Sequence, residues 1–188
     1  NLRIQMRRDI RELQQKLKLT TIFVTHDQEE ANTTSDRMAV LDQGVIQQVG
    51  APMDLYDNPA NLFVAKFLGT ANIINGNVVP NGDAATFETD KGMSIPLNQG
   101  SASGRSIVFR PQNVDVCAQG QGGGDAHATI TGKVHHTEFL GSIIRYGVDV
   151  NGDLVLVDHA HKLGESVFGV GDNVDLIIDR DSILVLAA

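Results

Sequence analysis

The residues best suited to chemistry lie in one segment, residues 20–31, where an apolar run passes into a polar turn. The run 20–25 is rich in threonine and other β-branched residues and predicts a buried strand. His26 follows directly, so its imidazole is expected at the carboxyl end of that strand, where open α/β sheets bind ligands. An imidazole in this position can donate a hydrogen bond from one nitrogen while a neighbour holds the other.

Other clusters are less well suited to chemistry. The pairs His135-His136 and His159-x-His161 have a spacing that metal ligands can use, but no cysteine or third ligand accompanies them. We therefore expect exposed strand histidines and no metal site. The glycine-dense stretch 120–124 lacks the Lys and Ser/Thr that follow a phosphate-binding loop, so we interpret it as a flexible loop.

A helix is expected before His26 and another after it. Residues 2–18 predict an amphipathic helix. One of its faces carries apolar residues at helical spacing: Met6, Ile10, Leu13 and Leu17. Six of the fifteen Lys and Arg residues fall within positions 3–18, which we interpret as a solvated helix face rather than an anion-binding patch. Residues 28–35 predict a short helix with Asp27 as its N-cap and Glu30 three residues on, as in a capping box.

The chain up to residue 70 then predicts a hairpin and two short helices. Residues 37–42 and 45–49 pair around Gln43-Gly44. Pro52 opens about one helical turn, since proline is suited to the first helical position. A further helix over 61–68 ends at Gly69.

Beyond residue 70, short apolar segments alternate with Gly, Asn and Asp, a pattern typical of a small barrel. Hairpin turns are expected at Asn81-Gly82, Asn151-Gly152 and Gly171-Asp172. The unbroken apolar run 154–157 is consistent with burial on both sides of its strand. Arg110 is expected to anchor a loop by pairing with a carboxylate. The candidate strands are 72–79, 84–88, 92–96, 105–109, 128–137, 143–150, 153–159, 173–179 and 182–186.

Two parts of the chain resemble one known family. Residues 25–31, Thr-His-Asp-Gln-Glu-Glu-Ala, resemble the switch-histidine loop of ABC transporter ATPases. Residues 36–69 resemble the segment that follows this loop in importer ATPases of the maltose, iron and polyamine types. Further on, the motifs Val-Phe-Arg-Pro at 108–111, Leu-Gly-Ser at 140–142 and Gly-Asp at 171–172 resemble, in order, the accessory barrel of the same ATPases, called TOBE.

The resemblance implies an α/β fragment over residues 1–70, the end of a P-loop NTPase-type domain, followed over 71–188 by an all-β, OB-like TOBE barrel. It implies the C-terminal part of an ABC importer ATPase subunit, which couples ATP hydrolysis to solute uptake with ATP and Mg²⁺. The join at 67–74 favours iron, phosphonate or polyamine importers over sugar importers. His26 would contact the γ-phosphate of ATP. The implied partners are a second ATPase subunit and membrane permease subunits, with the protein cytoplasmic and peripheral on the inner face of the cell membrane.

The chain contains no Walker A, Walker B or signature motif, and the 25 residues before His26 contain no glycine. We therefore expect this chain alone neither to hydrolyse ATP nor to hold a cofactor. The alternative is a free-standing ligand-binding or regulatory β module with an N-terminal docking arm. Because the apolar faces of residues 1–25 would have no sheet to cover them, we expect self-association or poor order in residues 1–70.

Composition excludes several other classes. A net charge of −8 and a pI near 5.1 argue against a nucleic-acid partner, because nucleic-acid binders carry a basic face. The single cysteine, Cys117, cannot form an intramolecular disulfide and fits a reducing cytosol. There is no run of eighteen apolar residues of the kind that spans a bilayer, and no signal peptide is recognised.

Overall fold

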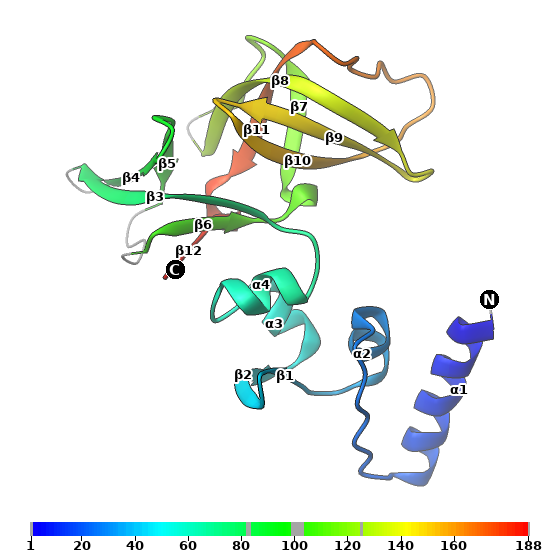
Figure 1. Ribbon diagram of the computed structural model, residues 1–188. Helices are drawn as coiled ribbons and strands as arrows, with labels where there is room; N and C mark the ends of the chain where they lie inside the picture. Colours follow the sequence, from blue (N-terminus) through cyan, green and yellow to red (C-terminus); the bar gives the residue numbers. More distant parts are fainter. Residues whose placement is uncertain (1, 82–83, 99–103, 125, 188) are drawn as a thin grey trace. The chain divides into compact units, whose positions relative to one another are not determined.

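The computed structural model describes residues 2–81, 84–98, 104–124 and 126–187. Contacts divide the chain into two units, Asn1–Gly69 and Thr70–Ala188. The first consists of helices and one small hairpin, and the second consists of strands with two short 3₁₀ turns (Figure 1). In the described part of the chain, no helix is both long enough and apolar enough to cross a membrane.

The first unit contains the helices and the hairpin that the sequence predicts. The hairpin turns at Gln43 and Gly44, whose φ values of 49° and 80° suit a tight two-residue turn. Asn61 caps the last helix with its side chain, and Gly69 follows that helix at a φ of 150°. In chain order the elements are α1 (Leu2–Leu17), α2 (Gln28–Thr34), β1 (Met38–Asp42), β2 (Val45–Gly50), α3 (Pro52–Asp57) and α4 (Leu62–Phe67).

The strand expected over residues 20–25 is absent, and that expectation was wrong. The segment is irregular, and Ile22 and Val24 are 90% and 91% exposed. A strand is stable only when a neighbouring strand takes up its backbone hydrogen bonds. The two strands described in this unit, β1 and β2, pair with each other and leave this segment without a ladder.

The core of the first unit lies between the hairpin and the helices α3 and α4. Its buried residues are Met38, Val40, Leu55, Val64 and Leu68. Helix α1 contributes nothing to this core. The apolar face expected for it is exposed, with Met6, Ile10, Leu13 and Leu17 between 42% and 56% accessible. The sequence correctly predicts the helix, and the described residues provide no cover for its face.

The second unit is built from two five-stranded antiparallel sheets (Figure 1). One has the order β10-β9-β8-β11-β7, and the other has the order β12-β6-β3-β4-β5. The strands of the first sheet are β7 (Val114–Ala118), β8 (His127–Phe139), β9 (Ile143–Val150), β10 (Asp153–Ala160) and β11 (Asn173–Asp179). Those of the second sheet are β3 (Asn72–Asn81), β4 (Ala84–Thr89), β5 (Ser94–Leu97), β6 (Ser106–Phe109) and β12 (Leu184–Leu186).

The first sheet curls so that its two edge strands, β7 and β10, approach each other. Both sheets share one core, in which the largest buried side chains are Tyr146, Phe87 and Phe109. The expected small barrel is therefore present as one curled sheet beside a second sheet. Two short 3₁₀ turns, η1 (Pro111–Asn113) and η2 (Arg180–Ser182), precede β7 and β12. Strand β7 was not expected from the sequence.

Two further expectations need correction, and a third is tested only in part. Gly171-Asp172 does not close a hairpin, because β10 and β11 are not neighbours; the turn bonds instead to Val134 of β8. The run 154–157 is not buried on both sides, since Leu154 is exposed and burial alternates along β10. Asn151-Gly152 does form the β9–β10 turn, with positive φ at both residues. The turn at Asn81-Gly82 lies partly outside the described residues.

Strand β3 lies in the middle of the second sheet, and the side chain of its first residue reaches the first sheet. Residues Asn72 to Asn75 pair with β6, and the pairing with β4 begins at Gly76. A Cβ at Gly76 would lie 2.2 Å from the backbone oxygen of Glu88, so only glycine fits there. The side chain of Asn72 reaches β10, where it donates to the Leu156 oxygen and accepts from the Leu156 N–H, both at 2.8 Å. This amide thus completes the hydrogen bonding on an edge of the first sheet.

Candidate functional site

The turn around His26 is held by hydrogen bonds between the residues on either side of it. Asp27 is the N-cap of α2, as the sequence predicts, and its Oδ1 accepts from the Glu30 N–H at 3.1 Å. The Asp27 N–H donates to Thr25 Oγ1 at 3.0 Å, and that hydroxyl donates to Glu30 Oε2 at 2.8 Å. Glu30 therefore completes the capping box through the Thr25 hydroxyl.

Two arginines of α1 bind the ends of α2. Arg7 Nη2 donates to Asp27 Oδ2 and Arg7 Nη1 donates to Glu29 Oε2, both at 3.1 Å. Arg7 Nε lies 3.9 Å from Glu30 Oε1. Arg11 donates to the carbonyl oxygen of Thr34 at 3.1 Å and pairs with Asp36. The basic residues of α1 were interpreted as a solvated face, and for Arg7, with an 11% exposed side chain, that interpretation was wrong.

The imidazole of His26 is exposed. Within the described residues it has no hydrogen bond or ion pair, in contrast to Asp27, Glu29 and Glu30 beside it. Both of its nitrogens are thus available to a ligand or to another protein segment. A hydrogen-bond donor on a turn fixed by its neighbours can contact an anion without much loss of conformational freedom.

The carboxylates beside His26 carry negative charge, which the guanidinium of Arg7 partly neutralises. The hydrogen bond with Glu29 raises the pKa of Arg7 above its ordinary value; burial opposes this, and the charges of Asp27, Glu29 and Glu30 add to the increase. Arg7 therefore remains cationic at every pH of interest. Likewise, the hydrogen bond from Arg11 lowers the pKa of Asp36.

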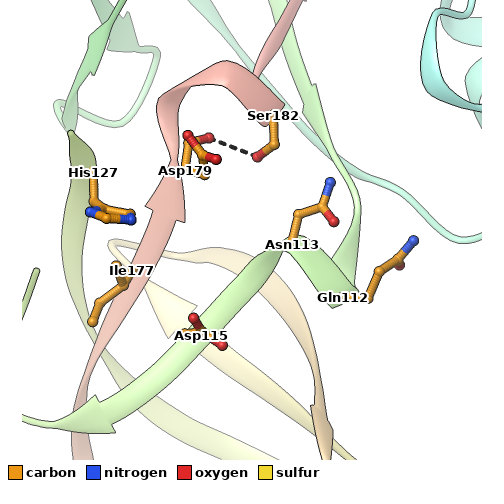
Figure 2. A pocket seen from close by; sticks show the side chains of 7 residues that line it. All are labelled: Gln112, Asn113, Asp115, His127, Ile177, Asp179 and Ser182. Carbon is orange, nitrogen blue, oxygen red and sulfur yellow. Dashed lines mark hydrogen bonds between the residues drawn. The ribbon is translucent and has the colours of Figure 1, made fainter.

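The second unit contains a polar pocket of about 380 Å³ (Figure 2). It lies between η1, β7, β8 and β11, and most of the side chains lining it are exposed. Asp179 accepts from the Asp181 N–H at 3.0 Å and so caps η2. The lining residues are Gln112, Asn113, Asp115, His127, Ile177, Asp179 and Ser182.

The other histidines of interest have structural neighbours. His135 and His136 lie at a bulge in β8, where the ring of His136 covers Gly147. His159 Nε2 is 3.3 Å from Glu165 Oε2, and His161 packs edge-on against Phe139. Among the described residues, no three His, Cys, Asp or Glu side chains are grouped so that they could hold a metal ion.

The remaining candidates are held within the second unit. Arg110 is buried and donates to the carbonyl oxygen of Thr70 at 3.2 Å. The glycine stretch 120–124 packs against β8 and β11, because the Gly120 N–H donates at 2.7 Å to the buried carboxylate of Asp175. Burial raises the pKa of the Cys117 thiol, and the carboxylates of Asp175 and Asp115 add to this increase.

The role of Arg7 was not recognised in the sequence. The sequence does contain a pattern that could have indicated this role: Arg7 and Arg11 are four residues apart and so lie on one face of the helix. Three carboxylates follow within residues 27–30. What the sequence does not give is the packing of α1 on α2 that brings these groups together.

Comparison with known proteins finds one matching family model and several curated relatives. The TOBE domain family matches residues 107–186. The Fe(3+) ions import ATP-binding protein FbpC of Rhizobium etli is 37% identical over 162 residues, which are 85% of this chain and 44% of that protein. The sn-glycerol-3-phosphate import ATP-binding protein UgpC of Escherichia coli K12 is 41% identical over 128 residues, 65% of this chain and 35% of that protein.

The chain thus spans less than half the length of these curated relatives. A solved structure of the cytoplasmic molybdate-binding protein ModG covers 63% of this chain and 96% of its own, with 12% identity and a TM-score of 0.48, too low to support an argument. The family match and the relatives agree with the resemblance seen in the sequence. The chain carries a TOBE domain and is a homologue of the C-terminal part of the ATP-binding subunits of ABC importers.

Proposed function

We propose that this chain supplies the switch-histidine loop and the accessory TOBE barrel of an ABC importer ATPase. In this proposal residues 1–70 end the nucleotide-binding domain and residues 71–188 form the accessory domain. The observation that carries the proposal is His26, an exposed imidazole on a turn fixed at Thr25 and Asp27. Homology to ATP-binding import subunits supports it.

In the proposed role, His26 donates a hydrogen bond to the γ-phosphate of ATP and helps to hold the attacking water in line. Phosphoryl transfer depends on positioning and on stabilising charge on the equatorial oxygens, both of which a fixed imidazole can provide. The described residues offer this one contact and no glycine-rich loop followed by Lys and Ser/Thr. The remaining phosphate and Mg²⁺ contacts therefore have to come from outside this chain.

The partners and the solute belong to the same proposal. The full-length protein would work as a pair of ATPase subunits on membrane permease subunits, at the cytoplasmic face of the membrane. The join at residues 67–74 favours iron, phosphonate or polyamine as the solute. Two relatives are named as importers of Fe(3+) ions and of sn-glycerol-3-phosphate, which supports iron or a phosphorus-containing compound as the solute.

The direct test is the ATPase activity of the full-length protein with His26→Ala. Losing one preorganised donor lowers kcat by roughly 10²–10³-fold. His161→Ala is a matched control, because it removes an exposed imidazole from the second unit. Activity within about twofold of wild type in the His26 variant would refute the role of His26. Tight, Mg²⁺-dependent ATP binding by the 188-residue chain alone would refute the proposal that its site is incomplete.

A further inference from the structure

We propose that Arg7 is a positioning residue for His26, holding the turn that carries the imidazole and offsetting the carboxylates beside it. The inference rests on the proposed function of His26 and adds to it a residue on a different helix. Arg7 comes from α1, nineteen positions earlier in the chain, and has no contact with His26 itself among the interactions described.

The contacts of Arg7 are those of a largely covered anchor. Its side chain is 11% exposed, and its guanidinium faces three carboxylates of the first turn of α2, two of them at 3.1 Å. A guanidinium can bind several carboxylates at once because its donors form a rigid, planar fork. A lysine would keep the charge but could not hold two of these oxygens in the same fixed geometry.

The network leads from Arg7 to both neighbours of His26. Arg7 binds Oδ2 of Asp27, while Oδ1 of the same carboxylate caps α2. The Asp27 N–H is bound by the hydroxyl of Thr25, which in turn donates to Glu30. Both neighbours of His26 are therefore linked to Arg7, Asp27 directly and Thr25 through the carboxylate of Glu30, so removing Arg7 would loosen the turn from both sides.

Arg7 also acts through its positive charge, which offsets the carboxylates beside His26. Asp27, Glu29 and Glu30 place three negative charges within four residues of the chain, next to a group proposed to meet a phosphate. Without a cation among them, these carboxylates would repel the phosphate. Arg8, the next residue of α1, is exposed and has no ion pair within the described residues, so it does not share this task.

The test compares Arg7→Ala, Arg7→Lys and Arg8→Ala in the full-length protein. Because small misplacements of a catalytic group can cost about 10²-fold in rate, we expect Arg7→Ala to lower kcat by roughly 10–100-fold. The KM for ATP should change by less than about threefold, since the other phosphate contacts remain. Arg7→Lys should recover part of the lost kcat, and Arg8→Ala should remain within about twofold of wild type.

A second measurement does not depend on activity. In the 188-residue chain, Arg7→Ala should lower the heteronuclear NOE of the His26 and Asp27 amides, whereas Arg8→Ala should not. This also covers the case in which the full-length Arg7→Ala protein fails to fold. Arg7→Lys then serves as the kinetic variant, with a kcat at least about threefold below wild type at an unchanged melting temperature.

The outcomes separate the two proposals. If His26→Ala inactivates the enzyme while both Arg7 variants keep wild-type kcat, the role of Arg7 is refuted and that of His26 stands. If the His26 variant is fully active, the proposed function fails. Unchanged NOE values in Arg7→Ala would also refute the positioning role, because the turn would then be held without the guanidinium.

Discussion

Replacing Asn72 by alanine tests how the two sheets of the TOBE-containing unit are joined. Asn72 is 4% exposed, and its amide makes two 2.8 Å hydrogen bonds to the backbone of Leu156 at an edge of the first sheet. Each such bond contributes about 1 kcal/mol net, and a buried backbone group left without a partner costs about 1–3 kcal/mol. Two groups lose their partner, and because Leu156 is only half-buried, water can replace part of the loss; the expected destabilisation is therefore about 2–4 kcal/mol, the lower part of the range for two groups.

The loss is large compared with a typical total stability of about 5–15 kcal/mol. Urea denaturation followed by circular dichroism measures it, because the chain has no tryptophan to report by fluorescence. Hydrogen exchange measures the same loss locally. At a factor of ten per 1.4 kcal/mol, the Leu156 amide should exchange roughly 30- to 700-fold faster in the variant than in the wild type.

Asn77→Ala is the matched control, since Asn77 lies on the same strand with an exposed side chain. It should stay within about 0.5 kcal/mol of wild type. Asn72→Asp keeps the acceptor for the Leu156 N–H but brings a buried charge, so its stability should improve as the introduced carboxyl is protonated at low pH. If Asn72→Ala costs no more than Asn77→Ala, the amide does not join the sheets as argued.

Three further predictions follow from single positions. Gly76→Ala should unfold the second unit, because its Cβ would meet the Glu88 backbone at 2.2 Å. Gly152→Ala, with a φ of 87° and no neighbour closer than 3.6 Å, should cost only about 1–2 kcal/mol in urea denaturation. Because folding raises the pKa of the Cys117 thiol, the protonated thiol favours the folded state. This contribution to the free energy of unfolding is complete below about pH 8.5 and is lost as the pH rises above it. At about pH 8.5 a thiol reagent should therefore react more slowly with the folded protein than with the unfolded protein. Light scattering should detect self-association that Leu13→Glu weakens, and a well-folded monomer would contradict it.

Local sequence signals were sufficient where a few neighbouring residues decide the structure. Gln43-Gly44 and Asn151-Gly152 form tight turns because these residue types tolerate positive φ. Asp27 caps α2 because its side chain reaches the Glu30 N–H three residues on. The same local reasoning placed His26 at the entrance of a helix, and the structure has it there.

The features that the sequence did not predict depend on residues far apart in the chain. The apolar run 20–25 is irregular because a strand needs a partner, which its own residues cannot supply. The residues of β7 were not recognised as a strand, although it pairs with β11, more than fifty positions later. Asn72 looks like an ordinary strand residue until Leu156 is placed beside it.

The sequence by itself determined the turns at Gln43-Gly44 and Asn151-Gly152, the Asp27 cap and the family, because each depends on residue types at short, fixed spacings. Only the tertiary structure decided which charges meet: Arg7 acquires its role from the packing of α1 on α2, and Asn72 from the approach of β10 to β3. A side chain's hydrogen-bond partner is set by proximity in space, and a spacing along the chain carries no information about proximity beyond a few residues.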